Sequence, residues 1–195
     1  MIDRRALIAA LPALASPAAA RARPDWPARL VAAARRQIGR TVLYDSAYVR
    51  LAYPGGDVPA DRGVCSDVII RAYRTAFGED LQKLVHEDMT RAFPAYPKSW
   101  GLKRPDRNID HRRVPNLETF LTRRGASLPL AGGWRAGDLV TQRLGGSLPH
   151  ISIVAADAAA GATPLVIHNI GAGTRAEPMA PAGVVGRFRF APVLG

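Results

Sequence analysis

Two apolar runs decide the fold, and they read Leu148-Pro149-His150-Ile151-Ser152-Ile153-Val154 and Leu165-Val166-Ile167-His168-Asn169-Ile170. Both are rich in β-branched residues, which favour strands, and turn-forming residues separate them. They are therefore expected to form an antiparallel β-hairpin. If Val154 lies opposite Pro164, then His150 lies opposite His168, and directly opposed side chains share one face of a sheet. A shift of one residue would place the two histidines on opposite faces.

The rest of the chain places helices before this hairpin and further strands around it. Apolar residues at helical spacing predict the helices, and β-branched runs predict the strands. The expected helices span 26–38, 65–77, 81–91 and 115–125, and the expected strands span 138–143, 151–156, 165–170 and 184–190. This order predicts an α+β domain in which N-terminal helices pack on a small antiparallel sheet, rather than alternating βαβ units.

Residues 93–115 are polar and broken by prolines, and a structureless segment of this length is uncommon unless it is functional. His111 lies in this segment. Its ring could grip a carboxylate on a substrate or serve the loop itself, and the sequence leaves both roles open. His86 lies beside two acidic residues on the expected helix 81–91, where it is expected to be solvated or part of a local network.

Cys65 is the only cysteine in the chain, so it cannot form an intramolecular disulfide. It opens the expected helix 65–77. The free N–H groups and the dipole at a helix N-terminus favour a thiolate, and the same N–H groups can hold an oxyanion. The position suits a nucleophile, although a purely structural cysteine is also common at a helix start.

The two strand histidines favour a catalytic role for Cys65. His150 would take the thiol proton, or hold an imidazolium beside a thiolate, and His168 would fix the tautomer of His150. Two alternatives stay open: the histidines could be core residues, or all three side chains could bind zinc. No short-spaced ligand pair such as CxxC or HExxH supports the zinc site, and no cofactor or metal is expected.

Residues 1–22 have the pattern of an export signal. Arg4 and Arg5 precede a short apolar run, 6–15, and small residues follow at 16–22. This order is typical of a secretory signal peptide, and the start also resembles a twin-arginine signal. An uncleaved helical anchor is the alternative. No other apolar run approaches the 18 residues of a membrane span, so residues 23–195 are expected to form one exported or periplasmic domain, without a membrane span and monomeric.

The chain is strongly basic, with a formal net charge of +11. A basic exported protein is attracted to anionic polymers such as those of the cell envelope. No finger spacing or aromatic-interleaved basic motif indicates nucleic-acid binding, so none is expected. The alternative is that the scattered arginines are simply a solvated surface.

Four runs of the sequence resemble the bacterial domain-of-unknown-function family numbered 1287, and the resemblance covers essentially all of the expected mature chain. These runs are Gly55-Gly56-Asp57-Val58-Pro59-Ala60-Asp61-Arg62-Gly63-Val64-Cys65-Ser66-Asp67-Val68, Leu81-Gln82-Lys83-Leu84-Val85-His86-Glu87-Asp88-Met89, Asn108-Ile109-Asp110-His111-Arg112-Arg113-Val114-Pro115-Asn116-Leu117 and Val166-Ile167-His168-Asn169-Ile170-Gly171.

That family in turn resembles a branch of the NlpC-type, papain-like cysteine peptidases and amidases. Their pattern is a cysteine opening a helix, a Gly-Asp-Leu-Val strand start, a histidine opening the next strand and a polar residue on the strand after it. Here the matching residues are Cys65-Ser66, Gly137-Asp138-Leu139-Val140, His150 and His168. The resemblance implies a papain-like fold, the roles of nucleophile, base and orienter in that order, and cell-wall peptides as substrates.

The chain departs from the superfamily pattern around the nucleophile. The usual Asp-Cys-Ser-Gly is replaced by Val64-Cys65-Ser66-Asp67, and Ser66 and Asp67 are candidate substrate contacts. The Asp67 carboxylate should oppose thiolate formation unless Arg62 or Arg71 pairs with it. A tyrosine ahead of the nucleophile often helps form the pocket in that superfamily, and Tyr44 and Tyr53 both remain candidates.

The resulting prediction is a cysteine hydrolase that cleaves amide bonds in peptidoglycan stem peptides through an acyl-enzyme. The bond between the second and third stem residues is the first expectation, and the bond joining lactate to the first alanine is its rival. The alternatives are a non-catalytic cell-wall-binding module and an amide or ester hydrolase acting on a lipid or another acyl substrate.

Overall fold

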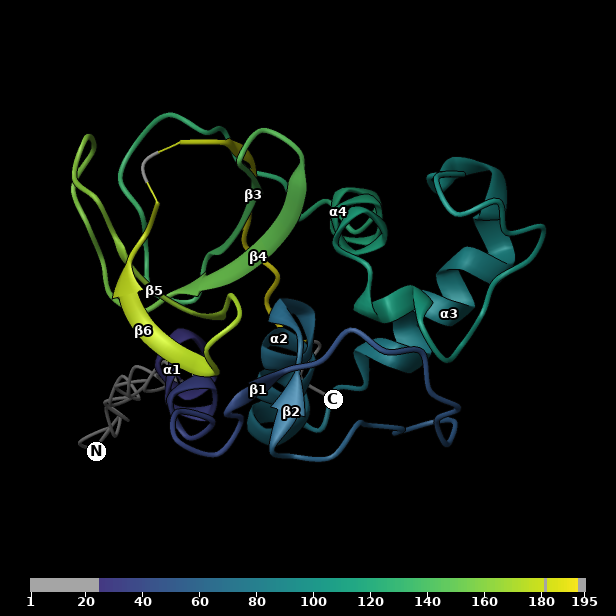
Figure 1. Cartoon of the computed structure of the whole chain (residues 1–195). Coiled ribbons are helices and arrows are strands. Elements are labelled where there is room, and N and C mark those ends of the chain that lie inside the picture. Colours follow the sequence, from purple (N-terminus) through teal and green to yellow (C-terminus); the bar gives the residue numbers. More distant parts are fainter. Residues whose placement is uncertain (1–24, 181, 193–195) are drawn as a thin grey trace, which may run out of the picture.

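The structure is a computed structural model that describes residues 25–180 and 182–192. The expected export signal, 1–22, lies outside the described residues. The predicted α+β class is confirmed: helices come first and a five-stranded sheet follows (Figure 1). The elements are α1 (Trp26–Arg35), β1 (Leu43–Tyr44), β2 (Arg62–Gly63), α2 (Cys65–Phe77), α3 (Leu81–Ala92), η1 (Phe93–Ala95), η2 (Asp110–Arg112), α4 (Val114–Arg123), β3 (Leu139–Leu144), β4 (Leu148–Val154), β5 (Leu165–Asn169), β6 (Thr174–Pro178) and β7 (Val184–Phe188).

The large sheet has the order β6-β5-β4-β3-β7, and every neighbouring pair is antiparallel. The sheet curls strongly, with α1 and α2 at its base and α3 farthest from it (Figure 1). Strand β6 was not predicted, because Thr174–Pro178 is polar and lacks an apolar alternation. A separate parallel pair joins β1 to β2, and neither of these two strands was predicted.

The register expected for the β4–β5 hairpin is wrong by two residues. Val154 pairs with Val166 rather than with Pro164. The turn between the strands takes up the extra residues because Ala158 pairs with Trp134 by two backbone hydrogen bonds of 2.8 and 3.0 Å. Since side chains alternate with a period of two, this shift keeps His150 and His168 on one face of the sheet.

Helix α2 has the bounds that the sequence predicted. Its apolar residues recur at helical spacing, and Gly78 ends it with the positive φ of 73° that glycine adopts without strain. Helix α1 ends three residues earlier than expected, at Arg35, and tight turns continue the chain to Arg40. Pro27 fits the first turn of α1 because that position needs no backbone donor.

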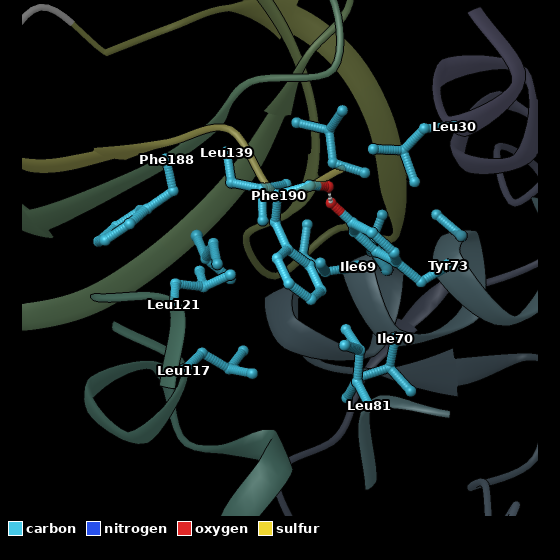
Figure 2. Packing of buried hydrophobic residues seen from close by; sticks show 14 of the residues in the cluster. Leu30, Ile69, Ile70, Tyr73, Leu81, Leu117, Leu121, Leu139, Phe188 and Phe190 are labelled. Carbon is cyan, nitrogen blue, oxygen red and sulfur yellow. Dashed lines mark hydrogen bonds between the residues drawn. The ribbon is translucent and has the colours of Figure 1, made fainter. Parts of the chain in front are cut away.

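The main core lies between the helices and one face of the sheet (Figure 2). Tyr73 of α2 lies in this core, and its hydroxyl donates to the Phe190 carbonyl at 2.6 Å. A second cluster covers the other face of the sheet, around Trp134, Val140 and Val154. The two clusters hold β4 on both faces, which fixes the position of His150 at its start.

None of the described helices is both long and apolar enough to cross a membrane.

Candidate active site

Cys65 is the first residue of α2 and is 3% exposed. Val64 precedes it in an extended conformation, and its N–H donates to Asp67 Oδ2 at 2.7 Å. This carboxylate therefore caps the helix start, since it satisfies a donor that the helix leaves free. The cap fixes the backbone on which the thiol is mounted.

The thiol lies where strands β4 and β5 separate. Their pairing extends only from Val154–Val166 to Ile153–Ile167. Val154 donates its N–H to Asp138 on the β3 side at 2.8 Å, so the alternation of a strand points the Ile151 N–H toward β5, beyond the end of the pairing. That N–H donates to the Cys65 thiol instead. The fork between the strands thus receives the start of α2.

Burial dominates the electrostatics of Cys65. It raises the pKa of the thiol to about 11, although the N–H groups of Ile151, Ser66 and Cys65 itself act in the opposite direction. The Asp67 charge raises this pKa slightly further. Cys65 is consequently a neutral thiol at pH 7, and helix position alone does not make it a thiolate.

His150, His168 and Glu177 form a chain of hydrogen bonds across three strands. His150 Nε2 lies 2.7 Å from His168 Nδ1, and His168 Nε2 lies 2.8 Å from Glu177 Oε1. A carboxylate only accepts, so His168 Nε2 carries a proton and its Nδ1 must accept in the neutral ring. His150 Nε2 then donates, which leaves His150 Nδ1 as a bare nitrogen able to act as a base.

His150 is neutral at pH 7, and His168 orients its ring. Burial is the main reason that the pKa of His150 is lowered to about 4, and the positive charge that His168 carries once it is protonated in acid lowers it further. Within the described ranges, no hydrogen bond joins its ring to the Cys65 thiol, and Ile151 is the residue that links the two positions. Both groups are neutral at pH 7, so the site holds a neutral thiol and a neutral imidazole rather than a thiolate–imidazolium pair.

Glu177 is the functional candidate that sequence reasoning missed. It lies on β6, the strand that was not predicted, and pairs across the sheet with Val166. One signal was available: Thr174 to Glu177 follow the His168 strand by the length of a tight hairpin, and Glu177 is their only carboxylate. A strand assignment there would have placed it beside the His168 face.

Glu177→Gln is expected to let His150 and His168 adopt more than one tautomer, because an amide side chain can either donate to or accept from His168 Nε2. In the wild type, the ¹⁵N chemical shifts of each ring should show one protonated and one bare nitrogen. In Glu177→Gln they should move toward the average of two tautomers. Turnover of a substrate should fall roughly tenfold, since a charge-assisted hydrogen bond is about 1–2 kcal/mol stronger than a neutral one. Arg175→Ala, which removes the other neighbour of Glu177 at 3.6 Å, is the control and should leave both readouts unchanged. Unaltered ring shifts in Glu177→Gln would contradict the assignment.

Asp67 is paired, but with neither of the expected arginines. Arg112 of η2 contacts both carboxylate oxygens of Asp67 at 3.0 Å, and both side chains are almost fully buried. Arg62 instead pairs with Asp45 and Asp61, and Arg71 with Asp57. The partner comes from 45 residues further along the chain, which no local pattern could indicate.

Arg112 also holds the wall of the site. It donates to the carbonyls of Asp45 and Ala47 at 3.0 and 3.1 Å, and its own carbonyl accepts from Ser66 Oγ at 2.6 Å. Ser66 is fully buried, and this bond satisfies its hydroxyl. Ser66 and Asp67 are thus engaged inside the protein, beneath the candidate nucleophile rather than in the groove.

A groove of about 430 Å³ opens beside Cys65. Tyr44 lies in its wall, and the pKa of Tyr44 is raised by burial, Cys65 and Asp67. Tyr53 lies elsewhere, with its ring 5.2 Å from that of His86. Of the two candidate tyrosines, Tyr44 lies in this groove and Tyr53 does not. The full lining is Tyr44, Ser46, Tyr48, Val64, Cys65, Trp100, Ile109, Arg112, Arg113, Val114, Pro115 and Pro149.

His111 does not reach the groove surface. It is 2% exposed in η2, although it belongs to the polar segment 93–115. Burial and the neighbouring Arg112 lower the pKa of His111 to about 3, so the ring is neutral. Its Nδ1 has no hydrogen-bond partner among residues 25–180 and 182–192. The structural role, rather than a grip on a substrate carboxylate, fits this position.

The buried His111 predicts a loss of stability in acid. Its pKa of about 3 in the folded chain lies below the ordinary value of 6.5, so the unfolded chain binds the proton more readily. The contribution of the neutral His111 ring to the free energy of unfolding is therefore fully present above pH 6.5. It falls by about 1.4 kcal/mol for each pH unit between 6.5 and 3. Urea unfolding of His111→Gln at pH 7.5, 5.5 and 4.5 should give a shallower decline than the wild type. His86→Gln, at a half-buried position, is the control, and parallel declines for all three proteins would contradict the prediction.

The zinc alternative finds no support in the side-chain arrangement. Among residues 25–180 and 182–192, no three His, Cys, Asp or Glu side chains are grouped so that they could hold a metal ion.

Comparison with known proteins identifies the family. Residues 31–190 match the family described as "Domain of unknown function (DUF1287)". The "Uncharacterized protein YijF" of Escherichia coli (strain K12) is 55% identical over 161 residues, which cover 80% of this chain and 78% of that protein. No solved structure matches the chain. The matched range includes Cys65, His150, His168 and Glu177. The chain belongs to the DUF1287 family.

Proposed function

We propose that this protein is a cysteine hydrolase with an NlpC-type, papain-like arrangement, in which Cys65 is the nucleophile and His150 the base. The observation that carries the proposal is the hydrogen-bond chain from Glu177 through His168 to His150, which leaves His150 Nδ1 free to accept a proton. A histidine base whose tautomer is fixed by a third group is the arrangement that many acyl-transfer enzymes use to activate a nucleophile.

The reaction begins from a neutral thiol and a neutral imidazole. As the Cys65 sulfur attacks an amide carbonyl in the groove, its proton passes to His150 Nδ1. The backbone N–H of Cys65, at the start of α2, stabilises the oxyanion. His150 then gives the proton to the leaving amine, and water releases the acyl group from the sulfur. Hydrogen bonds between a catalytic nucleophile and its base are often long before the substrate binds and shorten in the complex.

Peptidoglycan stem peptides are the proposed substrate, and export to the periplasm is proposed with them. Three features support this choice: the resemblance of Cys65, the Gly137 to Val140 strand start and His150 to cell-wall peptidases, the export-like residues 1–22 and the net charge of +11. The bond between the second and third stem residues is the first choice, with the lactate–alanine bond as its rival.

Digestion of purified sacculi tests the proposal. Mass spectrometry of the products should show new peptide termini that identify the bond and that increase with incubation time. Binding to sacculi without any new terminus would contradict a hydrolase and favour a wall-binding module. Release of an acyl chain from a lipid, with intact muropeptides, would support the proposed acyl-transfer mechanism and contradict peptidoglycan as the substrate.

A further inference from the structure

A second hollow, of about 950 Å³, adjoins the cysteine groove. Tyr48 lies in the wall of both, so the two spaces share a border. The walls of the hollow come from residues 48–51 and from the 101–108 part of the long polar loop. The segment 93–115 was expected to be functional because of its length, and this hollow is a physical reason for it.

Positive charge gathers around this hollow. Arg50, Lys103, Arg104 and Arg107 all line it, and all four are exposed. In the described part of the chain, no carboxylate forms a salt bridge with any of the four. Their charges are therefore available to a ligand.

Among the described residues, Asp106 is the only carboxylate that lines the hollow, and it already accepts hydrogen bonds. Its Oδ2 accepts from the Tyr48 hydroxyl at 3.1 Å, and its Oδ1 accepts from the Asn108 backbone and side chain, both at 2.9 Å. Asp106 thus links the two rims of the hollow, which are residues 48–51 and residues 101–108. With one carboxylate against four cations, the lining keeps a net positive charge.

The rims are braced by further hydrogen bonds. Asn108 Oδ1 accepts from the Leu51 N–H at 3.0 Å, which ties one rim to the other. Gln82, fully buried on α3, donates to the carbonyls of Ala52 and Arg107 at 3.0 and 3.1 Å. The cations are consequently mounted on a fixed frame, as a binding site needs.

We propose that this hollow is a subsite for an anionic group, a carboxylate or a phosphate, on the molecule whose acyl group is presented to Cys65. The role assigned to the whole molecule rests on the proposed function, whereas the anion site stands on its own charges and frame. Guanidinium and ammonium groups recognise both oxyanions, and a cationic hollow raises the local concentration of an anionic substrate.

Titration with two probes tests the subsite: a synthetic stem peptide with free carboxylates, and inorganic phosphate. The triple variant Arg50→Ala/Lys103→Ala/Arg104→Ala should weaken binding of at least one probe on the order of tenfold. The control Arg35→Ala/Arg36→Ala/Arg40→Ala removes the same charge from exposed residues that line neither space, and its affinity should stay within about twofold of the wild type.

Loss of peptide affinity alone would identify a carboxylate, and loss of phosphate affinity would identify a phosphate. Equal losses of probe affinity in both triple variants would show that only the overall charge matters, and they would overturn the proposal. The absence of probe binding by the wild type would overturn it as well. Binding is measured in the Cys65→Ala background, which cannot turn the peptide over. An intact subsite in a chain whose wild type cleaves no sacculi would overturn the peptidoglycan substrate and leave the subsite standing.

Discussion

Cys65→Ala and His150→Ala are each expected to lower the turnover of sacculi by at least about a thousandfold. The alanine at 65 removes the only atom that can form the acyl-enzyme. The alanine at 150 removes the base, and with a thiol pKa of about 11 very little thiolate is present at pH 7 without it. The two losses should be far from additive in the double variant, because both residues act in one proton transfer.

Ser152→Ala is the matched control for these variants. Ser152 lies on β4, two residues after His150 and on the same face of the sheet, and its Oγ has no hydrogen-bond partner in the part of the chain that the structure describes. Its removal should leave turnover unchanged and the fold intact. Full activity in Cys65→Ala or His150→Ala, with unfolding midpoints equal to that of the wild type, would rule out the proposed mechanism.

Alkylation by iodoacetamide provides a second readout that needs no substrate. A free thiol reacts with a midpoint near pH 8.5. Burial of Cys65 raises its pKa to about 11, so the wild-type midpoint should lie well above that of a free thiol. A midpoint below 8.5 would show a resting thiolate and would replace the neutral pair with an ion pair.

Local patterns predicted the parts of the fold that depend on neighbouring residues. The bounds of α2 follow from one apolar stripe and from Gly78, and the face shared by His150 and His168 follows from the period of a strand. Both are short-range properties. The register of the same hairpin was wrong because it depends on Trp134, which holds the connecting turn from outside the hairpin.

The residues that the sequence did not reveal act over long separations. Glu177 belongs to a polar edge strand, whose place beside β5 is set by pairing rather than by its own composition. Arg112 lies 45 residues from Asp67, and His111 beside it is buried in a run that reads as polar loop. A buried ion pair makes such a run acceptable in the interior, and only the folded chain brings its partners together.

Arg112→Met is expected to lower the free energy of unfolding by about 3–5 kcal/mol, because it leaves the buried Asp67 carboxylate without the positive charge that balances it. It also removes the donors that hold the carbonyls of Asp45 and Ala47, so the groove wall next to Tyr44 should loosen and turnover should fall with stability. Urea unfolding and the sacculus assay measure the two effects.

A double variant separates the ion pair from simple packing. In Asp67→Asn/Arg112→Met the buried charges are both absent, and the Asn side chain can still accept from the Val64 N–H. The double variant should therefore be more stable than Arg112→Met alone. Arg123→Met is the matched control, since Arg123 is partly exposed in its pair with Asp88 and should cost no more than about 1 kcal/mol. If Arg112→Met costs no more than this control, the Asp67 carboxylate gains no significant stabilisation from Arg112, and another interaction must hold the start of α2 beneath Cys65.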